Sequence, residues 1–379
     1  MKKKILSLAL VGALVMGGCS DGKKPQSPEE TKPIFFSMNR CSYGNGVVFG
    51  YENATYLDFD TMEKAPLCAM PNCVHDNGSC LARIIGAQPV FYNDYVYYFT
   101  SNNGAVRETT DGKEFYIESK LWRASLDSSQ TEIVCEFTDC APQQGYPDYV
   151  LYGNELYFIG DNLNPTNGPD GIIASWSNVG GYHYLCSINL DTGEYTNYGS
   201  ITDEDKQYEF SANSSGANIT GVYNDTMYIG YAFIKEEPDD ITTVDDVNFT
   251  FLSFEFDFET KTWKESELPF SRYMNNDTYT YYDYEADELH VIHEKGELVI
   301  PHAGEITQMS EFNGKLFSPH DGTDGVWYDL ADGSEHSMGE YKEYDVLGYH
   351  DDCYILAKGG RTAKITEEEL IATSEIKED

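Results

Sequence analysis

The chain contains 379 residues and is strongly acidic, with 25 Lys and Arg against 64 Asp and Glu and a formal net charge of −39. No basic cluster lies beyond the first four residues, so the composition offers no phosphate-binding face and argues against nucleic acid as a partner. Aromatic residues make up 14% of the chain, including 30 Tyr, and long helical patterns are few, so we expect one large β domain.

The first 18 residues are typical of an export signal. Lysines at positions 2–4 precede an apolar-rich run over residues 5–16, which is too short to span a bilayer. The run ends in Gly17, Gly18 and Cys19. This ending resembles a bacterial lipobox, which implies cleavage before Cys19 and lipid attachment to it. We therefore expect an exported protein anchored to the outer face of the cell membrane by its N-terminal lipid. An ordinary signal peptide that precedes a cysteine by chance is the alternative.

Residues 19–33 form a predicted flexible tether. Beyond Cys19 this segment contains no large apolar residue and is rich in Pro, Ser and charged residues, so it cannot bury enough surface to fold. We expect the folded domain to occupy residues 34–372 and an acidic tail to occupy residues 373–379.

A short pattern recurs seven times along the predicted domain. Each copy begins with a polar or Gly turn and continues with alternating aliphatic and aromatic residues, which is typical of a strand that follows a hairpin turn. The copies lie at residues 44–50, 93–99, 153–160, 224–231, 286–293, 313–320 and 351–359.

A second element follows most copies and ends in an acidic turn. These elements lie at residues 55–63, 121–129, 184–195, 252–263, 326–336 and 362–370. Their alternating side chains predict strands, and the turns predict hairpins. Two hairpins per repeat make a four-stranded antiparallel sheet, and a repeat of roughly 48 residues has the spacing of propeller blades.

The sequence therefore predicts an all-β fold, a β-propeller with seven blades of four-stranded antiparallel sheet. The fifth unit is short and the fourth carries an insertion at residues 235–248, so six or eight blades are alternatives, and two stacked β-sandwich domains are the rival architecture. The repeats resemble those of exported bacterial propeller lipoproteins, many of them uncharacterised and from Gram-positive species. This resemblance covers nearly all of the mature chain. It implies the fold but no activity, because propellers host binding proteins, scaffolds and enzymes.

Cys68, Cys73, His75 and Cys80 lie close together between the first and second predicted blades. Three thiolates and one imidazole are a complete tetrahedral set for structural zinc, and the intervening Pro, Asn, Asp and Gly residues can form the necessary turns. The spacing lacks the C-x2-C pair of most zinc sites and the cell exterior is often oxidising, so a disulfide within the group is the alternative, with free thiols as a third. The propeller lipoproteins carry similar clusters at this place, with no activity attached to them.

The remaining cysteines carry weaker signals. Cys135 and Cys140 have a C-x4-C spacing without a nearby His, so a local disulfide is a candidate. Cys41, Cys186 and Cys353 stand alone within strand-like segments, and we expect them to be small buried thiols.

Aromatic residues supply weak candidates for ligand binding. Tyr279 and Tyr281 lie in a Tyr-rich stretch over residues 273–288, and Trp176 lies in a long predicted loop. Such side chains can stack on sugars or peptides. The alternation of the tyrosines favours a simpler interpretation, in which they line one strand of a blade.

We expect a non-catalytic module that binds a glycan, a peptide or a protein at loops on one mouth of the ring. The alternative is an enzyme that acts on extracellular polysaccharide through carboxylates at the central channel. An enzyme of this kind needs two or three inward-facing acids with perturbed pKa values around one pocket, whereas a binding module does not.

Overall fold

The computed structural model describes residues 32–36, 41–49, 54–68, 73–75, 80–84, 89–109, 112–126, 129–142, 148–167, 173–201, 216–234, 249–271, 273–275, 277–301, 309–318, 325–358 and 360–374. The predicted signal segment, the predicted lipidation residue Cys19 and most of the tether lie outside these residues. Within them, no helix is long and apolar enough to cross a membrane.

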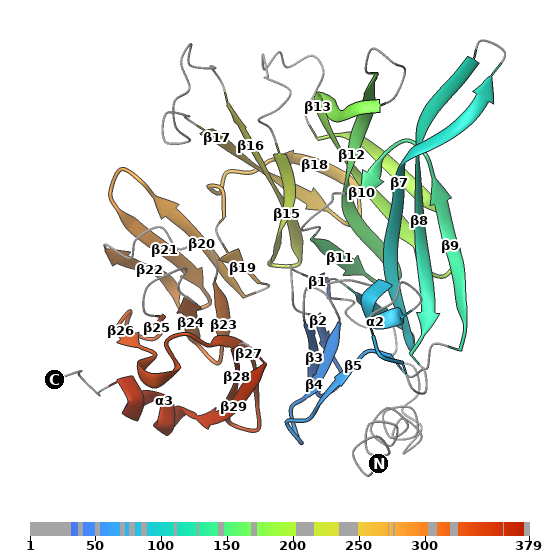
Figure 1. Ribbon diagram of the computed structural model, residues 1–379. Helices are drawn as coiled ribbons and strands as arrows, with labels where there is room; N and C mark the ends of the chain where they lie inside the picture. Colours follow the sequence, from blue (N-terminus) through green and yellow to red (C-terminus); the bar gives the residue numbers. More distant parts are fainter. Residues whose placement is uncertain are drawn as a thin grey trace.

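Seven antiparallel sheets follow one another along the described chain and form a seven-bladed β-propeller, which confirms the predicted fold (Figure 1). The colours of Figure 1 run around the ring from blue, through green and yellow, to red. Five blades have four strands each. Blade one contains β2 (Cys41–Tyr43), β3 (Gly46–Phe49), β4 (Thr55–Asp58) and β5 (Lys64–Pro66), and blade two contains β6 (Val90–Tyr92), β7 (Tyr95–Thr109), β8 (Gly112–Ser125) and β9 (Thr131–Phe137). Blades four, five and six contain β15 (Gly216–Tyr223), β16 (Thr226–Ile234), β17 (Phe249–Asp257) and β18 (Thr262–Glu265); β19 (Tyr273–Met274), β20 (Thr278–Asp283), β21 (Glu288–His293) and β22 (Gly296–Pro301); and β23 (Ser310–Phe312), β24 (Lys315–Ser318), β25 (Val326–Asp329) and β26 (Glu335–Ser337).

Blades three and seven depart from the predicted four strands. Blade three has six strands, namely β1 (Ile34–Phe36), β10 (Ala141–Pro142), β11 (Tyr149–Tyr152), β12 (Glu155–Asn167), β13 (Ile173–Asn189) and β14 (Tyr195–Ser200). Blade seven has three, namely β27 (Asp345–His350), β28 (Cys353–Lys358) and β29 (Arg361–Thr366). The N-terminal strand β1 adds to blade three, and a C-terminal helix follows the third strand of blade seven.

The recurring polar pair of the sequence pattern forms the tight turn between the first and second strands of a blade. In four blades both turn residues have a left-handed backbone, as at Asn93 and Asp94 (φ 47° and 64°), and the corresponding pairs are 224–225, 313–314 and 351–352. Two left-handed residues give the two-residue turn whose twist matches that of the flanking strands, and Asn, Asp and Gly tolerate this backbone best. The pattern therefore has a local conformational cause.

Six of the seven copies occupy this first turn and the second strand, but the fifth copy does not. Residues 286–293 cover the turn between β20 and β21 and the third strand of blade five, one strand later than in the other blades. A polar turn followed by alternating apolar residues marks a hairpin, but it does not say which hairpin of the blade is meant. The copy count gave the correct number of blades although this copy was assigned to the wrong strand.

β1 extends blade three on its inner side. It pairs antiparallel with β11, from Ile34 opposite Leu151 to Phe36 opposite Tyr149. β11 is the first strand of its blade and contacts β15, the first strand of the next blade, and β1 contacts β15 as well. Because first strands line the centre of the ring, β1 occupies the central channel beside β11. Phe36 is buried in the core shared by blades one, two and three, and Phe35 packs against the core between blades three and four.

A helix takes the place of a fourth strand in blade seven. The acidic residues after β29 were expected to form a turn, but they form the first turn of α3 (Glu367–Ser374). Thr366 and Glu369 form a capping box: the Glu369 backbone N–H donates to Thr366 Oγ1 at 3.2 Å, and the Thr366 N–H donates to Glu369 Oε2 at 2.8 Å. The helix contacts the short 3-10 helix η3 (Gly339–Tyr341) and β26 of blade six, and its Leu370 is fully buried.

Strand direction defines two faces of the ring. The turn face carries the tight turns between first and second strands. The hairpin face carries the connections between second and third strands and those between blades. In blades two and three the second and third strands are 13 to 17 residues long, so their hairpins rise far above the ring at the top of Figure 1. Since β1 runs antiparallel to β11, Ile34 lies at the turn-face end of the channel, and the tether enters there.

Candidate metal centre

The predicted Cys and His residues converge on the connection between blades one and two. Cys68 follows β5, and Cys80 directly precedes the short helix α2 (Leu81–Ile84). Two backbone hydrogen bonds hold the segment against blade one: Ala54 N–H donates to Ala82 O, and Leu67 N–H donates to Ala54 O, both at 2.8 Å. β5 runs away from the turn face, so the group lies on the hairpin face.

One ligand atom from each of Cys68, Cys73, His75 and Cys80 lies within 4.8 Å of every other. His75 Nδ1 is 3.3 Å from Cys80 Sγ, and the His75 backbone N–H donates to Cys73 Sγ at 3.4 Å. A tetrahedral zinc ion with Zn–S distances of ~2.3 Å places its ligand atoms about 3.5–3.8 Å apart. The spread in this group is close to that size, so the four side chains could hold a metal ion.

The backbone and burial of the group suit a closed site. His75 has a left-handed backbone (φ 58°), which turns the chain between two of the ligands. Cys68 and Cys80 are buried, and Leu67 and Ala82 pack against their sulfurs. Four protein donors leave no open coordination position, so a metal held here would be structural. The same proximity would also permit a disulfide between two of the sulfurs, and the convergence of an imidazole on them favours metal.

Cys135 and Cys140, the other candidate disulfide, point to different neighbours. Cys135 Sγ lies 3.9 Å from Glu136 O, whereas Cys140 Sγ lies 3.8 Å from Cys186 Sγ. Both sulfurs are buried, and burial raises the pKa of the Cys135 thiol above its ordinary value. The structure therefore brings Cys140 to a cysteine that is distant in sequence, a contact that spacing alone did not indicate.

The three aromatic candidates for ligand binding, Tyr279, Tyr281 and Trp176, lie in different surroundings. Tyr279 is fully buried and its hydroxyl donates to Pro269 O, so it belongs to the core of blade five and cannot stack on a ligand. Tyr281 is half-buried, stacks on His290 at 4.5 Å and donates to Glu297 at 3.2 Å. Trp176 lies on β13, and its side chain is outside the described part of the chain.

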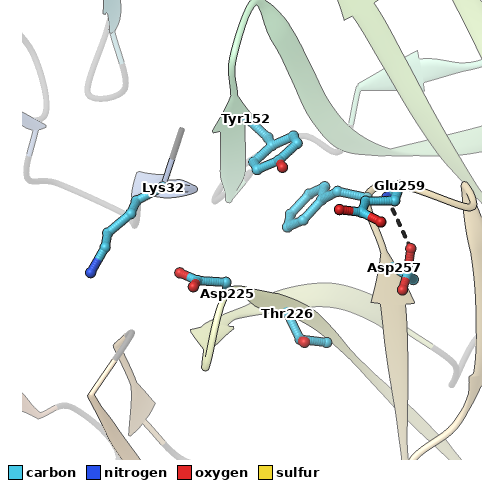
Figure 2. Close-up of a pocket in the computed structure, with 7 residues that line it drawn as sticks. Lys32, Tyr152, Asp225, Thr226, Asp257 and Glu259 are labelled. Carbon is cyan, nitrogen blue, oxygen red and sulfur yellow. Dashed lines mark hydrogen bonds between the residues drawn. The ribbon is translucent and has the colours of Figure 1, made fainter. Parts of the chain in front are cut away.

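A half-open pocket of about 440 Å³ lies on the turn face between blades three and four (Figure 2). Tyr152 stacks on Phe258 at 4.4 Å to form its apolar side, while Asp225 and the turn around Asp257 form its acidic side. Lys32, at the end of the tether, contributes a cation to the lining. In Figure 2 the ammonium of Lys32 points away from Tyr152.

The described carboxyl groups with perturbed pKa values lie at exposed turns and strand ends, and one of them, Asp257, also lines this pocket. Every such pKa moves down, and hydrogen bonds are the main cause: from His350 to Asp60, from the Thr260 backbone to Asp257, from His290 to Glu297, and from the Ser334 side chain to Asp332. A general acid that works at neutral pH needs the opposite shift. These four groups therefore support turns and surface ion pairs.

One polar group that sequence reasoning missed lies at the seam between blades seven and one. His350 Nε2 is 2.7 Å from Asp60 Oδ1 and 3.4 Å from Asp351 Oδ2. Asp60 lies on the β4–β5 turn of blade one and His350 ends β27 of blade seven, so the contact joins the first and last blades. The two residues are 290 positions apart, and no local pattern pairs them.

Comparisons with known proteins find only distant structural similarity. No family model matches the chain, and no curated protein matches it. Among solved structures, it is similar to the β-propeller domain of the Trilobed protease from Pyrococcus furiosus, with 10% identity over 88% of this chain and 98% of that one and a TM-score of 0.39. It is also similar to YjhT, with 13% identity over 89% and 99% and a TM-score of 0.38, and to BamB from Moraxella catarrhalis, with 9% identity over 89% and 88% and a TM-score of 0.36. These neighbours are distant, and the assignment of the β-propeller fold rests on the seven sheets of the structure itself.

Proposed function

We propose that this protein is an exported, lipid-anchored propeller that binds an extracytoplasmic glycan, peptide or protein at its hairpin face, without catalysis. One observation carries the proposal: the tether enters the ring at the turn face, through β1, while the tall hairpins of blades two and three stand on the opposite face. A lipid on Cys19 would therefore hold the turn face toward the membrane and present the hairpin face to the surroundings.

Exposed apolar side chains on the hairpin face support a binding role. Val74, in the connection after blade one, is 72% exposed, and Tyr284, at the β20–β21 turn, is 55% exposed. Phe251, near the start of β17, is also exposed. Aromatic and apolar side chains of this kind are frequent anchors in recognition surfaces.

The described carboxyl groups favour binding over the enzymatic alternative. Hydrolysis of a glycan by two carboxylates needs a pair about 5–10 Å apart that flanks the bond, one of them with a raised pKa. Among the described residues, the perturbed carboxyl groups have lowered pKa values and serve turns and ion pairs. The proposal therefore assigns no chemical step to them.

We further propose that Cys68, Cys73, His75 and Cys80 hold a structural zinc ion that fixes the connection between blades one and two. Zinc would join four donors in a connection whose described residues form only a small apolar cluster of their own. This would order the hairpin face around Val74, which lies between two of the ligands.

Metal analysis of the purified mature protein tests the zinc site. We expect one zinc per chain, released on acidification, and loss of the metal in Cys73→Ser and His75→Ala. The matched control Cys353→Ser changes a half-buried thiol in blade seven and should retain zinc. Absence of zinc, together with a disulfide within the group, would contradict the site.

Binding to glycan and peptide arrays, followed by mass analysis of the bound material, tests the function. We expect unmodified ligand on the array, and weaker binding for Val74→Ser and Tyr284→Ser. Ile371→Ser is the matched control, because Ile371 is 38% exposed but lies on α3, at the turn face. Cleaved ligand would establish the enzymatic alternative, and equal losses in all three variants would contradict binding at the hairpin face.

A further inference from the structure

Cys140 and Cys186 form a buried sulfur pair between blades two and three. Cys140 lies just before β10, which leaves blade two and pairs with β12, and Cys186 lies on β13. Their Sγ atoms are 3.8 Å apart although the residues are 46 positions apart, and both side chains are fully buried. A disulfide requires the sulfurs to approach to about 2.0 Å, and these two sulfurs are already in contact.

Gly160 on β12 makes the room for this pair. It lies opposite Pro142 on β10 and opposite Tyr184 on β13, so β12 runs between the strand that follows Cys140 and the strand that contains Cys186. A Cβ atom at position 160 would lie 2.4 Å from Cys140 Sγ and 3.5 Å from Cys186 Sγ. Any other residue at this position would displace the Cys140 sulfur, so the strand is shaped around the pair.

Tyr195 and Asp139 complete the polar surroundings. The Tyr195 hydroxyl oxygen is 3.4 Å from Cys140 Sγ and 3.3 Å from Cys186 Sγ, and the hydroxyl donates to Asp139 at 2.9 Å. Asn197 Nδ2 also donates to Asp139, at 2.8 Å. The Tyr195 hydroxyl still donates to Asp139 after the two thiols have lost their protons. Formation of the disulfide therefore leaves no hydrogen-bond donor of this group without a partner.

We propose that Cys140 and Cys186, and not the sequence neighbours Cys135 and Cys140, form a disulfide in the exported protein. The proposal rests on the proposed export, since an oxidising exterior supplies the reaction partner. Two thiols and one disulfide of a low-molecular-weight or protein oxidant become one Cys140–Cys186 bond and two oxidant thiols. Two S–H bonds break, the Sγ–Sγ bond forms, the oxidant's S–S bond is reduced, and its sulfurs take the two protons.

The surroundings of the two thiols favour formation of the disulfide during folding, and not in the folded protein. The hydrogen bond with Cys186 and burial both raise the pKa of Cys140 well above its ordinary value, so the folded protein holds a protonated thiol and little of the thiolate that attacks a disulfide. Once formed, the bond would be shielded from external reductants. It would join the exit of blade two to the third strand of blade three.

Peptide mapping of the full mature protein, alkylated in denaturant before and after reduction, tests the pairing. We expect Cys140 and Cys186 in one disulfide-linked peptide pair, a mass lower by two hydrogens than that of the reduced pair, and no reduction of the native protein in a time that fully reduces the unfolded chain. Cys186→Ala should free Cys140 for alkylation after unfolding, and the matched control Cys135→Ala should keep the bridge. A disulfide-linked Cys135–Cys140 peptide, or a Cys140 that is alkylated before reduction in the wild-type protein, would overturn the proposal. This wild-type result decides even where a variant does not fold.

Refolding of the reduced chain with glutathione disulfide separates the pairing from the proposed location. Formation of the Cys140–Cys186 bond in this mixture supports the pairing without reference to the cell. If the bond forms there but is absent from protein recovered from cells, the pairing stands and export to an oxidising exterior fails. If it does not form there and Cys140 remains alkylatable, the pairing fails.

Discussion

Blade three and the seam between blades seven and one use the two chain ends in opposite ways. The N-terminal strand β1 joins blade three, far along the sequence, and inserts at its inner edge. At the seam, no strand is shared between the first and last blades within the described residues, and α3 covers blade seven where a fourth strand would lie. The ring therefore closes by side-chain packing, while the N terminus reinforces a blade that is already complete.

The seam depends on a separate apolar cluster and a few polar contacts. Leu57 of blade one and Ile355 of blade seven are fully buried in this cluster. Lys64 Nζ donates to Gly360 O at 2.5 Å, and Lys364 Nζ donates to Phe59 O at 3.1 Å. Packing of this kind can close a ring without strand exchange, since a fully buried Leu or Ile side chain contributes roughly 1.5–3 kcal/mol.

The largest expected effect concerns β1. Phe36→Ala should lower the free energy of unfolding by about 3–5 kcal/mol, because the phenyl ring is buried in the core shared by blades one, two and three. Denaturant titration measures the change. The control Ile34→Ala alters a side chain that is 52% exposed on the same strand and should cost less than ~0.5 kcal/mol. Equal effects would show that β1 does not insert as described.

The second effect concerns the attachment of α3 to blade six. Lys315 is buried, and its Nζ is 2.7 Å from Glu367 Oε1 and 3.9 Å from Asp329 Oδ2. Glu367→Gln should cost about 1–3 kcal/mol, below the full value for a broken buried pair, because Glu367 is partly solvated and Asp329 remains. The control Glu368→Gln changes an exposed charge in the same helical turn and should leave the thermal midpoint unchanged. Identical midpoints for both variants would argue against the ion pair.

The third effect concerns the helix start. Thr366→Ala removes the capping hydroxyl and should destabilise α3 by about 1 kcal/mol, whereas Thr366→Ser keeps the oxygen and should retain most of the stability. Hydrogen exchange of residues 367–374 measures the loss locally. If Thr366→Ala accelerated exchange in blade three more than in α3, the cap would not act separately on the C-terminal region.

The smallest effect is pH-dependent and belongs to the seam. Hydrogen bonds from His350 and Asn45 lower the pKa of Asp60 below its ordinary value of 3.8. A carboxyl group with a lowered folded-state pKa contributes stability above the unfolded value and loses it as the pH falls through the folded value. Protection of blades one and seven should therefore decrease below about pH 4 in the wild type, and this decrease should be smaller in Asp60→Asn.

Asp332→Asn provides the control for this experiment. The pKa of Asp332 is also lowered, by Ser334, but Asp332 lies in a turn of blade six. It should leave the pH dependence at the seam unchanged. The same response in both variants would remove the special role of the Asp60–His350 contact.

Sequence patterns predicted the blades because their causes are local. Turn pairs such as Asn93 and Asp94 require left-handed backbones that few residues tolerate, and strand alternation follows from burial of one face. The four donors of the candidate metal centre were also visible, because they lie within one short segment. The sequence predicted that they converge, but it did not indicate the left-handed backbone of His75.

The features that sequence analysis missed depend on contacts between distant residues. β1 is only three residues long, and its partner β11 lies more than a hundred positions away, so no periodicity links them. The pairing of Cys140 with Cys186 depends on the path of β10 across β12 and on the space left at Gly160. The acidic run after β29 was mistaken for a turn because its capping box is also a plausible turn sequence.

Cross-linking of the N-terminal strand tests the central claim most directly. Phe35 lies opposite Val150, so a Phe35→Cys, Val150→Cys variant should form a disulfide on mild oxidation that peptide mapping detects. A Phe35→Cys, Ala363→Cys variant, which would pair if β1 instead completed blade seven beside β29, should not. A cross-link in the second variant and none in the first would contradict a ring in which the N terminus reinforces blade three and the seam closes by packing.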